Sequence, residues 1–421
     1  MNLLLVYPRW RKLERQVVFH LPPHGPVVFA ATLDEDIEVT FVDENVETLD
    51  LDVSPDMVAI SMMLTAQLPR AFEIAAIFRK RNIPVIAGGI ATMLHSEEVG
   101  KNVDSIFLGE AEDGHVQKLF QDFTAGELKP VYNFLHDFPA IETVGTARRD
   151  ILKRELYNHK GMQMFDLIHA SRGCHFNCYP CCTPFLGGRK FRPRPIEKVI
   201  QEIETIDNNR LFFVDNSMAQ DKKWEEELFK ALIPLKKKWV CHPIEEDDDI
   251  LDLAYQAGCW YVYQAVVDMS DLIRNRIKRY HDHGIAVEGT IILGMDNHDI
   301  DYIKRLIDFL LEIELELAEF TILTPFSHTP ARRQLEREGR ILIQDPALYT
   351  GDRVVFQPLK LTITELQDMY YYAWETFYQD ISCETAMADM YMRVIRREMA
   401  DGSFKRSRRR KQKFKLPQDV S

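Results

Sequence analysis

The sequence predicts an α/β protein built from two parallel-sheet domains and a helical C-terminal region. Five short apolar runs alternate with helical stretches over residues 1–135, and six more follow over residues 161–330. Alternation of strands and helices favours parallel sheets, because each crossover helix returns the chain to the same edge. The length of 421 residues also suits two or three domains.

Residues 1–135 are expected to form a doubly wound, Rossmann-like domain. The predicted strands are NLLLVYP, IEVTFVDEN, DMVAISMM, IPVIAGG and VDSIFLGEAE. The stretch PRAFEIAAIFRKRN predicts an amphipathic helix between the third and fourth strands. No GxGxxG follows the first strand, which argues against a dinucleotide site. Ligands of such sheets bind at the carboxyl ends of the strands, here marked by Gly88-Gly89 and Gly109-Glu110.

The periodic pattern breaks over residues 136–160, which we interpret as a linker. The next domain, residues 161–330, has the predicted strands DLIHAS, RLFFVD, KKWVCH, CWYVYQAV, IAVEGTIILGM and LELAEFTILTP. Six right-handed strand–helix units curl into a partial (β/α)6 barrel. Residues 331–404 form the helical region, whose aromatic cluster MYYYAWETFY is typical of a core or interface, although it could cover a flat substrate.

Composition excludes several classes of protein. Hydrophobic residues make up 46% of the chain, which excludes a disordered protein, and no apolar run approaches the roughly 18 residues of a membrane span. The net charge of −13 argues against general nucleic-acid binding. The basic tail, residues 405–421, is expected to be solvated. We expect a cytoplasmic protein, because the N-terminus lacks the charge order of a secretory signal.

Four of the seven cysteines lie within nine residues: Cys174, Cys178, Cys181 and Cys182. They directly follow the strand DLIHA, so they lie in a loop at the carboxyl end of a strand. The spacing CxxxCxxC favours metal binding, since three thiolates on one loop can bind three irons of a four-iron cluster and leave the fourth open. The alternatives are an incidental group of thiols and a structural zinc site with His175 or Cys182 as fourth ligand, but no second pair of zinc ligands is evident.

A CxxxCxxC loop after the first strand of a six-unit partial barrel resembles the radical S-adenosylmethionine (radical SAM) enzymes. The N-terminal domain resembles the cobalamin-binding-type domain of one subgroup, which includes the anaerobic tetrapyrrole cyclase and many C-methyltransferases. The segments that carry the resemblance in the first domain are LPPHGPVVFAA, VDEN, VAISMM, IPVIAGGIATML and FLGEAE. In the barrel they are RGCHFNCYPCC, GRKFRPRPIEKVIQEI, LFFVDNSMAQD, HDHGIAVEGTIILGMD and FTILTPFSHTP.

The resemblance implies that Cys174, Cys178 and Cys181 ligate a [4Fe–4S] cluster. The amino and carboxylate groups of SAM would chelate the open iron. An electron from the reduced cluster would then cleave SAM, normally to a 5′-deoxyadenosyl radical that abstracts hydrogen from a small-molecule substrate. A flavodoxin- or ferredoxin-type protein is the implied electron donor. Cys182 lies outside the motif and is expected to be a packed thiol.

Five further residues are expected to bind SAM. Asp215 and Asn216 follow the second barrel strand, where the family contacts the amino group of SAM, although both also suit a helix cap. His242 ends the third strand and should face the same cavity. Gln264 stands where the family has a Gly-x-Glu-Ser-like segment, with Asp268 as the alternative to it, and Gly289 would let the fifth strand approach adenine closely. No catalytic residue is assigned.

Two departures from the family leave questions open. The altered fourth-strand segment around Gln264 leaves the direction of SAM cleavage open. The DxHxxG motif that supplies a cobalt-ligating histidine in many cobalamin proteins is absent, and His20 and His24 do not fit its pattern. We interpret both histidines as ordinary packed or surface residues. Cobalamin binding is an open alternative, because members without this motif also bind it.

The resemblance therefore implies a radical SAM enzyme that functionalises an unactivated carbon of a biosynthetic intermediate, by methylation, hydroxylation or cyclisation. Bacteriochlorophyll-type tetrapyrroles, hopanoids and antibiotic precursors are the substrate classes it suggests. One alternative is transfer of the 3-amino-3-carboxypropyl group of SAM. The other is a non-catalytic cluster- or cobalamin-binding protein for sensing or electron transfer.

Overall fold

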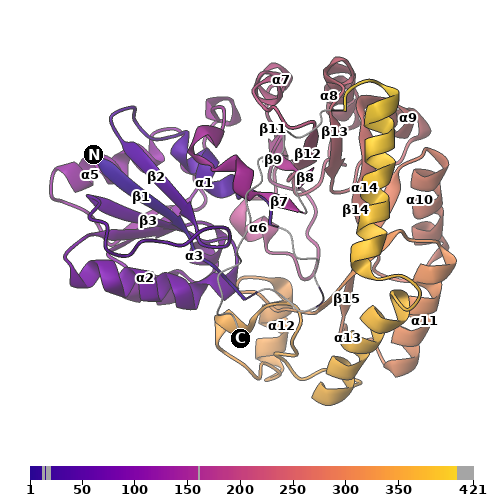
Figure 1. The fold of residues 1–421 in the computed structure, drawn as a ribbon. Coiled ribbons are helices and arrows are strands. Elements are labelled where there is room, and N and C mark those ends of the chain that lie inside the picture. The colour runs from indigo at the N-terminus through magenta and orange to yellow at the C-terminus, as the bar shows by residue number, and fades with distance from the viewer. Residues whose placement is uncertain (12–14, 16–19, 160–161, 405–421) are drawn as a thin grey trace.

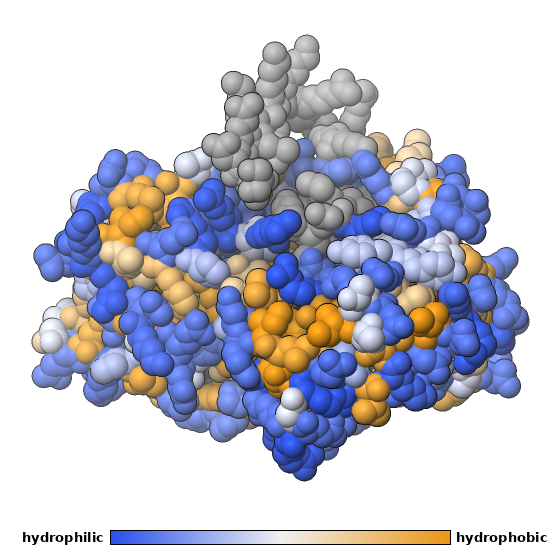
Figure 2. Space-filling view, turned by 90° about the horizontal axis from the view of Figure 1, so that it is seen from below, coloured by the Kyte–Doolittle hydropathy of each residue, from blue (hydrophilic) through white to orange (hydrophobic). Residues whose placement is uncertain are grey.

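The computed structural model describes residues 1–11, 15, 20–159 and 162–404. Two domains, each built on a parallel sheet, lie side by side, and the C-terminal helices pack against the second (Figure 1). The basic tail predicted at residues 405–421 lies outside the described residues. None of the described helices is long and apolar enough to cross a membrane. Figure 2 shows a face on which apolar patches are interspersed with hydrophilic side chains.

The N-terminal sheet has the strand order β2-β1-β3-β4-β5-β6, with every neighbouring pair parallel. Its strands are β1 Asn2–Tyr7, β2 Glu38–Asp43, β3 Met57–Ser61, β4 Val85–Gly88, β5 Ser105–Gly109 and β6 Val131–Phe134. β2 lies on one side of β1, and β3 to β6 lie on the other side, so the strand order reverses between β1 and β3. The five predicted strands are present. The sixth, β6, was not predicted, because its sequence VYNF alternates exposed and buried positions instead of forming an apolar run.

Helices cover both faces of this sheet, which confirms the doubly wound fold (Figure 1). They are α1 His24–Ala30, α2 Leu68–Lys80, α3 Ile90–Leu94, α4 Ser96–Asn102 and α5 His115–Thr124. The predicted helix PRAFEIAAIFRKRN corresponds to α2, which buries Ile74 and Phe78 against the sheet and ends in Arg79 and Lys80. Basic side chains there favour the C-terminal end of the helix dipole.

The segment between the domains has little regular structure, but it is packed. It contains three short 3₁₀ helices, η2 Ile141–Thr143, η3 Arg149–Ile151 and η4 Arg154–Leu156, and then β7 Asn158–His159, which pairs with β8 Met162–Gln163. Its side chains Val144, Ala147, Leu152 and Tyr157 are buried. Ala147, Leu152 and Tyr157 belong to the hydrophobic core of the N-terminal domain, so the segment packs against that domain.

The second sheet has the order β16-β15-β14-β13-β12-β9 and is parallel throughout, as expected for a six-unit partial barrel. Its strands are β9 Asp166–Ile168, β12 Arg210–Phe213, β13 Lys238–Cys241, β14 Cys259–Ala265, β15 Ala286–Leu293 and β16 Leu317–Ile322. The outer helices are α7 Ile196–Glu204, α8 Lys222–Leu232, α9 Asp248–Ala257, α10 Asp271–Asp282 and α11 Ile300–Glu312. The predicted apolar face of α7 is buried at Val199 and Ile203.

Three helices complete the chain: α12 Pro330–Arg337, α13 Ile363–Phe377 and α14 Cys383–Ala400. The aromatic cluster lies on α13, and its Trp374 and Phe377 pack against Phe320 of β16, with ring centroids 5.6 and 6.0 Å away. The buried members of the cluster, Tyr370, Trp374 and Phe377, are part of the core, whereas Tyr371 and Tyr372 are exposed. On α14, Tyr391 packs against Phe165 and Trp260 beside the first and fourth barrel strands.

Candidate functional site

The cysteines lie in a loop that is closed at its base by a short antiparallel pair, β10 Ser171–Arg172 with β11 Arg192–Pro193. A single helical turn, α6 Thr183–Leu186, lies within the loop. Gly173, next to the first cysteine, has a φ of +74°, and a Cβ there would lie 2.2 Å from the carbonyl oxygen of Lys190. Because only glycine fits this position, the backbone is fixed directly beside Cys174.

The three motif cysteines are free thiols that differ in exposure. Cys174 is buried, Cys181 is half-buried and Cys178 is exposed. Burial raises the pKa of both Cys174 and Cys178, and the neighbouring Cys181 raises it further. The thiols of Cys174 and Cys178 are therefore protonated at neutral pH, and metal binding must release their protons.

The donor set fits an iron–sulfur cluster better than a single ion. Within the described ranges, no three His, Cys, Asp or Glu side chains lie close enough together to hold one metal ion. A structural zinc site needs four ligands around a single centre, whereas the motif supplies three cysteines. Each cluster thiolate ligates a separate iron, so spaced cysteines on one flexible loop suit it.

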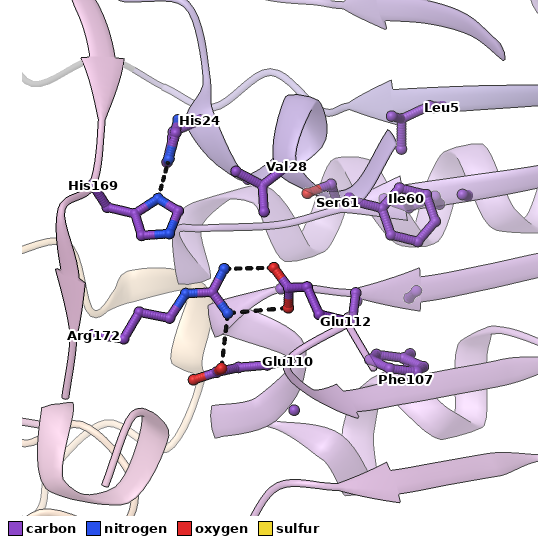
Figure 3. A pocket seen from close by; sticks show the side chains of 18 of the residues that line it. Leu5, His24, Val28, Ile60, Ser61, Phe107, Glu110, Glu112, His169 and Arg172 are labelled. Carbon is purple, nitrogen blue, oxygen red and sulfur yellow. Dashed lines mark hydrogen bonds and ion pairs between the residues drawn. The ribbon is translucent and has the colours of Figure 1, made fainter. Parts of the chain in front are cut away.

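A cavity of about 330 Å³ lies between the N-terminal sheet and the barrel (Figure 3). Its apolar wall comes from strands of the N-terminal sheet: Leu5, Ala59, Ile86 and Phe107. Gly88, Gly89 and Gly109, at the carboxyl ends of β4 and β5, also line it. Gly89 is required by close approach as well, since a Cβ there would lie 2.4 Å from the carbonyl oxygen of Met62.

Two histidines meet in the cavity wall. His24 of α1 and His169, which follows β9, are joined by a 2.7 Å hydrogen bond between Nε2 and Nδ1 (Figure 3). Burial lowers the pKa of both well below the usual value, and nearby arginines lower it further, so both are neutral. The interpretation of His24 as an ordinary residue missed its place in this wall. His20 instead bonds to the buried Asp43 at 2.8 Å.

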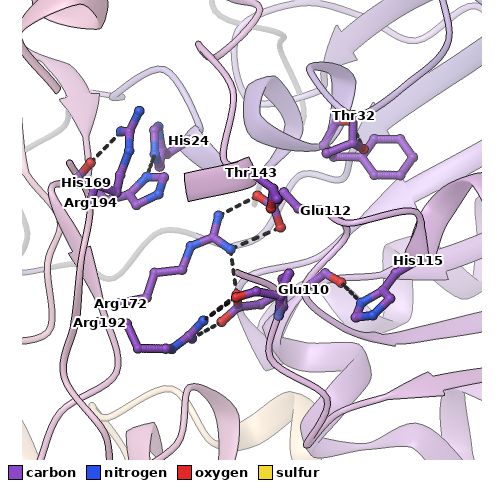
Figure 4. A network of polar contacts seen from close by, with 12 residues as sticks. His24, Thr32, Glu110, Glu112, His115, Thr143, His169, Arg172, Arg192 and Arg194 are labelled. Carbon is purple, nitrogen blue, oxygen red and sulfur yellow. Dashed lines mark hydrogen bonds and ion pairs between the residues drawn. The ribbon is translucent and has the colours of Figure 1, made fainter. Parts of the chain in front are cut away.

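An ion-pair cluster ties the base of the cysteine loop to the N-terminal domain (Figure 4). Arg172 donates to Glu112 at 2.6 and 3.0 Å and to Glu110 at 2.8 Å. Arg192 also donates to Glu110. Glu110 and Glu112 follow β5, within the segment FLGEAE. We call Arg172, Arg192, Glu110 and Glu112 the interdomain clamp.

Asp215, Asn216 and His242 lie near one another at the carboxyl ends of the second and third barrel strands. The Asp215 carboxylate accepts from the backbone N–H of Ala170 at 3.0 Å and from the hydroxyl of Ser171. Burial raises the pKa of Asp215 to about 6. Its carboxylate thus supports the start of the cysteine loop. Asn216 is exposed and lines the cavity.

His242 donates from Nδ1 to the carbonyl oxygen of Asp215 at 2.7 Å, and burial lowers its pKa. Its ring lies beside Phe212 and Tyr263, with centroids 5.8 and 5.7 Å away. Phe212 and Tyr263 themselves stack at 5.3 Å. These three rings form an aromatic wall on neighbouring strands, which the sequence pattern did not identify as a unit.

Gln264 and Gly289 are paired in register on β14 and β15, but the structure does not bring them to this aromatic wall. A Cβ on Gly289 would contact Leu315 and Val266, which belong to the core between strands and helices. Gln264 is buried and donates to the carbonyl of Ala265. Successive residues of a strand face opposite sides, so Tyr263 occupies the aromatic wall and Gln264 faces the other way.

Glu288 is a second residue that sequence reasoning missed. It pairs in register with Tyr263, and its Oε2 is buried without a hydrogen-bond partner. Burial, and next the nearby Glu319, raises its pKa to about 8, so it is protonated at neutral pH. A glutamate within the otherwise apolar run IAVEGTIIL was the available signal.

The comparisons with known proteins agree with this architecture. The chain is 25% identical over 364 residues to the bacteriochlorophyllide d C-12(1)-methyltransferase of Chlorobaculum tepidum, covering 80% of this chain and 78% of that one. It is 24% identical over 393 residues to the hopanoid C-2 methylase of Rhodopseudomonas palustris, covering 82% and 72%. No family model matches the chain.

Among solved structures, the fold is similar to that of the radical S-adenosylmethionine methyltransferase TsrM from Kitasatospora setae, solved with cobalamin and a [4Fe–4S] cluster bound. The TM-score is 0.64 at 16% identity, over 90% of this chain and 88% of that chain. The fold and the cysteine loop define a two-domain protein with a partial barrel suited to an iron–sulfur cluster. In sequence the chain is similar to two carbon methyltransferases, and in fold it is similar to a radical SAM methyltransferase.

Proposed function

We propose that this enzyme is a cobalamin-dependent radical SAM methyltransferase that methylates a carbon atom of a small biosynthetic intermediate. The observation that carries the proposal is the cavity at the carboxyl edge of the N-terminal sheet, whose far wall is formed by the residues that lead into the cysteine loop. A carrier bound there and a cluster bound by the loop would be adjacent. The methyltransferase names of the two curated relatives support the same reaction.

The residues present fit both cofactors. Cys174, Cys178 and Cys181 would hold a [4Fe–4S] cluster, and the apolar wall with its glycine rim would hold part of a cobalamin. When bound, the cluster and SAM supply one-electron cleavage of SAM, and cobalamin supplies a methyl carrier. The protein binds and orients these groups and excludes water from between them.

The aromatic wall supports SAM and substrate binding in this proposal. Asn216 and His242 lie at strand ends beside the cysteine loop, where their polar atoms can bind the amino-acid part of SAM. We propose that Gln264 and Gly289 contribute to SAM binding only through the backbone of their strands. Asp215 acts through the loop that it supports.

For the substrate, we propose a flat conjugated ring system, with a bacteriochlorophyll-type tetrapyrrole as the first candidate. The stacked pair Phe212 and Tyr263 offers ring faces that favour such a molecule. One relative is named for a bacteriochlorophyllide, which supports the candidate, while the other is named for a hopanoid. We also propose a flavodoxin- or ferredoxin-type electron donor.

The experiment is an anaerobic turnover assay on the full chain. The cluster is reconstituted, hydroxocobalamin and SAM are added, titanium(III) citrate replaces the protein donor, and SAM-derived products are identified by mass spectrometry. We expect cobalamin-dependent formation of S-adenosylhomocysteine, and 5′-deoxyadenosine once substrate is supplied. The control replaces Cys174, Cys178 and Cys181 together by alanine.

Two results would contradict the proposal. Formation of 5′-methylthioadenosine would support transfer of the 3-amino-3-carboxypropyl group instead. Binding of hydroxocobalamin to the reconstituted protein is measured by the visible absorption of cobalamin that stays with the protein after gel filtration. Absence of binding would exclude a cobalamin-dependent reaction. Bacteriochlorophyllide and hopanoid substrates are compared in parallel to test the substrate class.

A further inference from the structure

The interdomain clamp lies between the cysteine loop and the cavity beside the N-terminal sheet, two sites that come from separate segments of the sequence. Arg172 is one residue away from Gly173 and two from Cys174, so it belongs to the cysteine loop. Arg172, Glu110 and Glu112 also line the cavity of the N-terminal domain. The same side chains therefore form the base of one site and the wall of the other.

The clamp is buried and highly connected. The side chains of Arg172 and Arg192 are 16% and 11% exposed, and that of Glu112 is 3% exposed. Burial alone would raise the pKa of Glu110, but Arg192 and Arg172 lower it below its usual value. Charge pairs in such surroundings act more strongly than on the surface, since little water screens them.

The clamp bridges both strands at the base of the cysteine loop. Arg172 and Arg192 are directly opposite each other in the β10–β11 pair, where two guanidinium groups would repel. Glu110 binds both of them, and Glu112 binds Arg172. The spacing of these two strands thus depends on carboxylates that come from the other domain.

We propose that the interdomain clamp couples the two sites, so that a cluster in the cysteine loop strengthens ligand binding in the cavity. The inference rests on the proposed function, which places a corrinoid in that cavity. A cluster bound at Cys174 immobilises the adjacent backbone and holds the Arg172 guanidinium in the cavity wall. A wall that is already ordered loses less entropy when the ligand binds. Linkage requires the ligand to stabilise the loop by the same factor.

The test measures the dissociation constant of hydroxocobalamin for the full chain in two forms, with the cluster reconstituted and after iron removal by a chelator. For the wild type we expect binding at least about fivefold tighter with the cluster, the lower range of typical coupling between sites. In Glu112→Gln we expect the two constants to agree within about twofold. Arg172→Lys, which keeps the charge but loses the bidentate bonds, should lie between them.

The control is Asp122→Asn, which removes another buried carboxylate of the same domain. Asp122 binds Lys118, Lys129 and Tyr132, all of which belong to the N-terminal domain and none to the cysteine loop. Asp122→Asn should keep the wild-type ratio of the hydroxocobalamin dissociation constants measured without and with the cluster. Equal dissociation constants for the wild type with and without the cluster would overturn the clamp proposal alone. The same conclusion would follow if Glu112→Gln kept the wild-type ratio of the two constants and a normal circular dichroism spectrum. Absence of hydroxocobalamin binding by reconstituted wild type would overturn the proposed function as well.

Discussion

At the scale of single residues, the cysteine loop depends on one backbone conformation. Gly173 combines a positive φ with contact to the backbone of Lys190, and backbone atoms cannot move aside as a flexible side chain can. The three cysteine ligands could be predicted from their spacing. The contact with Lys190 could not, because it joins residues 17 positions apart across the loop.

Gly173→Ala should therefore prevent cluster assembly. We expect iron and acid-labile sulfide after reconstitution to fall by at least about fivefold, since the strain costs several times the thermal energy. Gly126→Ala is the matched control, because Gly126 has the same φ of +74° with no atom within 4 Å of an added Cβ. Iron content equal in the two variants would contradict the prediction.

Cys182 offers a second comparison within the loop. Burial raises its pKa to about 11, so it is a poor source of thiolate. We expect Cys182→Ala to keep the iron content of the wild type and Cys178→Ala to lose most of it. Iron determination and the absorbance near 400 nm measure both. Loss of iron in Cys182→Ala would instead assign this residue as a ligand.

Glu288 predicts the pH dependence of stability. Its pKa is about 8 in the folded protein and near 4.5 when unfolded, so the folded state holds the extra proton between these values. The contribution of Glu288 to stability must therefore fall as pH rises from 5 to 8. Relative to the wild type, the thermal midpoint of Glu288→Gln should rise with pH over this range. An identical pH profile in the variant would contradict the shift.

At the scale of elements, strands buried on both faces could be predicted and exposed or alternating ones could not. The run IAVEGTIILGM contains β15, whereas VYNF gave no signal for β6. The register within a strand was the other limit. Gln264 was the candidate taken from the altered fourth-strand segment, but the side of the sheet that it faces depends on pairing with β15. A shift of one residue along a strand moves a side chain to the opposite face of the sheet.

The last helix makes a further element-scale prediction. On α14, Glu398 is fully buried and binds Arg210 of β12 at 2.6 Å and Asn209 at 3.1 Å. Glu398→Ala leaves the buried Arg210 without its carboxylate partner and should cost about 3–5 kcal/mol, seen as a lower midpoint in the first urea transition. Glu227→Ala removes an exposed pair with Lys223 and should cost less than about 1 kcal/mol. Equal losses would show that α14 does not anchor the barrel in this way.

At the scale of the whole molecule, the interface between the two domains consists of charged groups and a cavity. This interface could not be predicted from sequence patterns. Glu112 in FLGEAE and Arg172 in RGC are 60 residues apart in sequence. The sequence pattern of each segment indicates only the end of a strand in its own domain. Their contact follows only when both sheets are placed with their carboxyl edges facing each other. The architecture of each domain followed from local patterns, whereas the site that joins them depends on how the domains pack.

The position of α14 also has a consequence during synthesis. All six strands of the N-terminal sheet are complete by Phe134, so this domain can fold while the remainder is still being translated. The barrel cannot finish so early, because Tyr391 on α14 packs onto Phe165 and Trp260. Its apolar base therefore stays open until nearly the whole chain has left the ribosome. Chaperone dependence and aggregation during expression should follow the barrel, and chains that end before residue 383 should be degraded even though their first domain is folded.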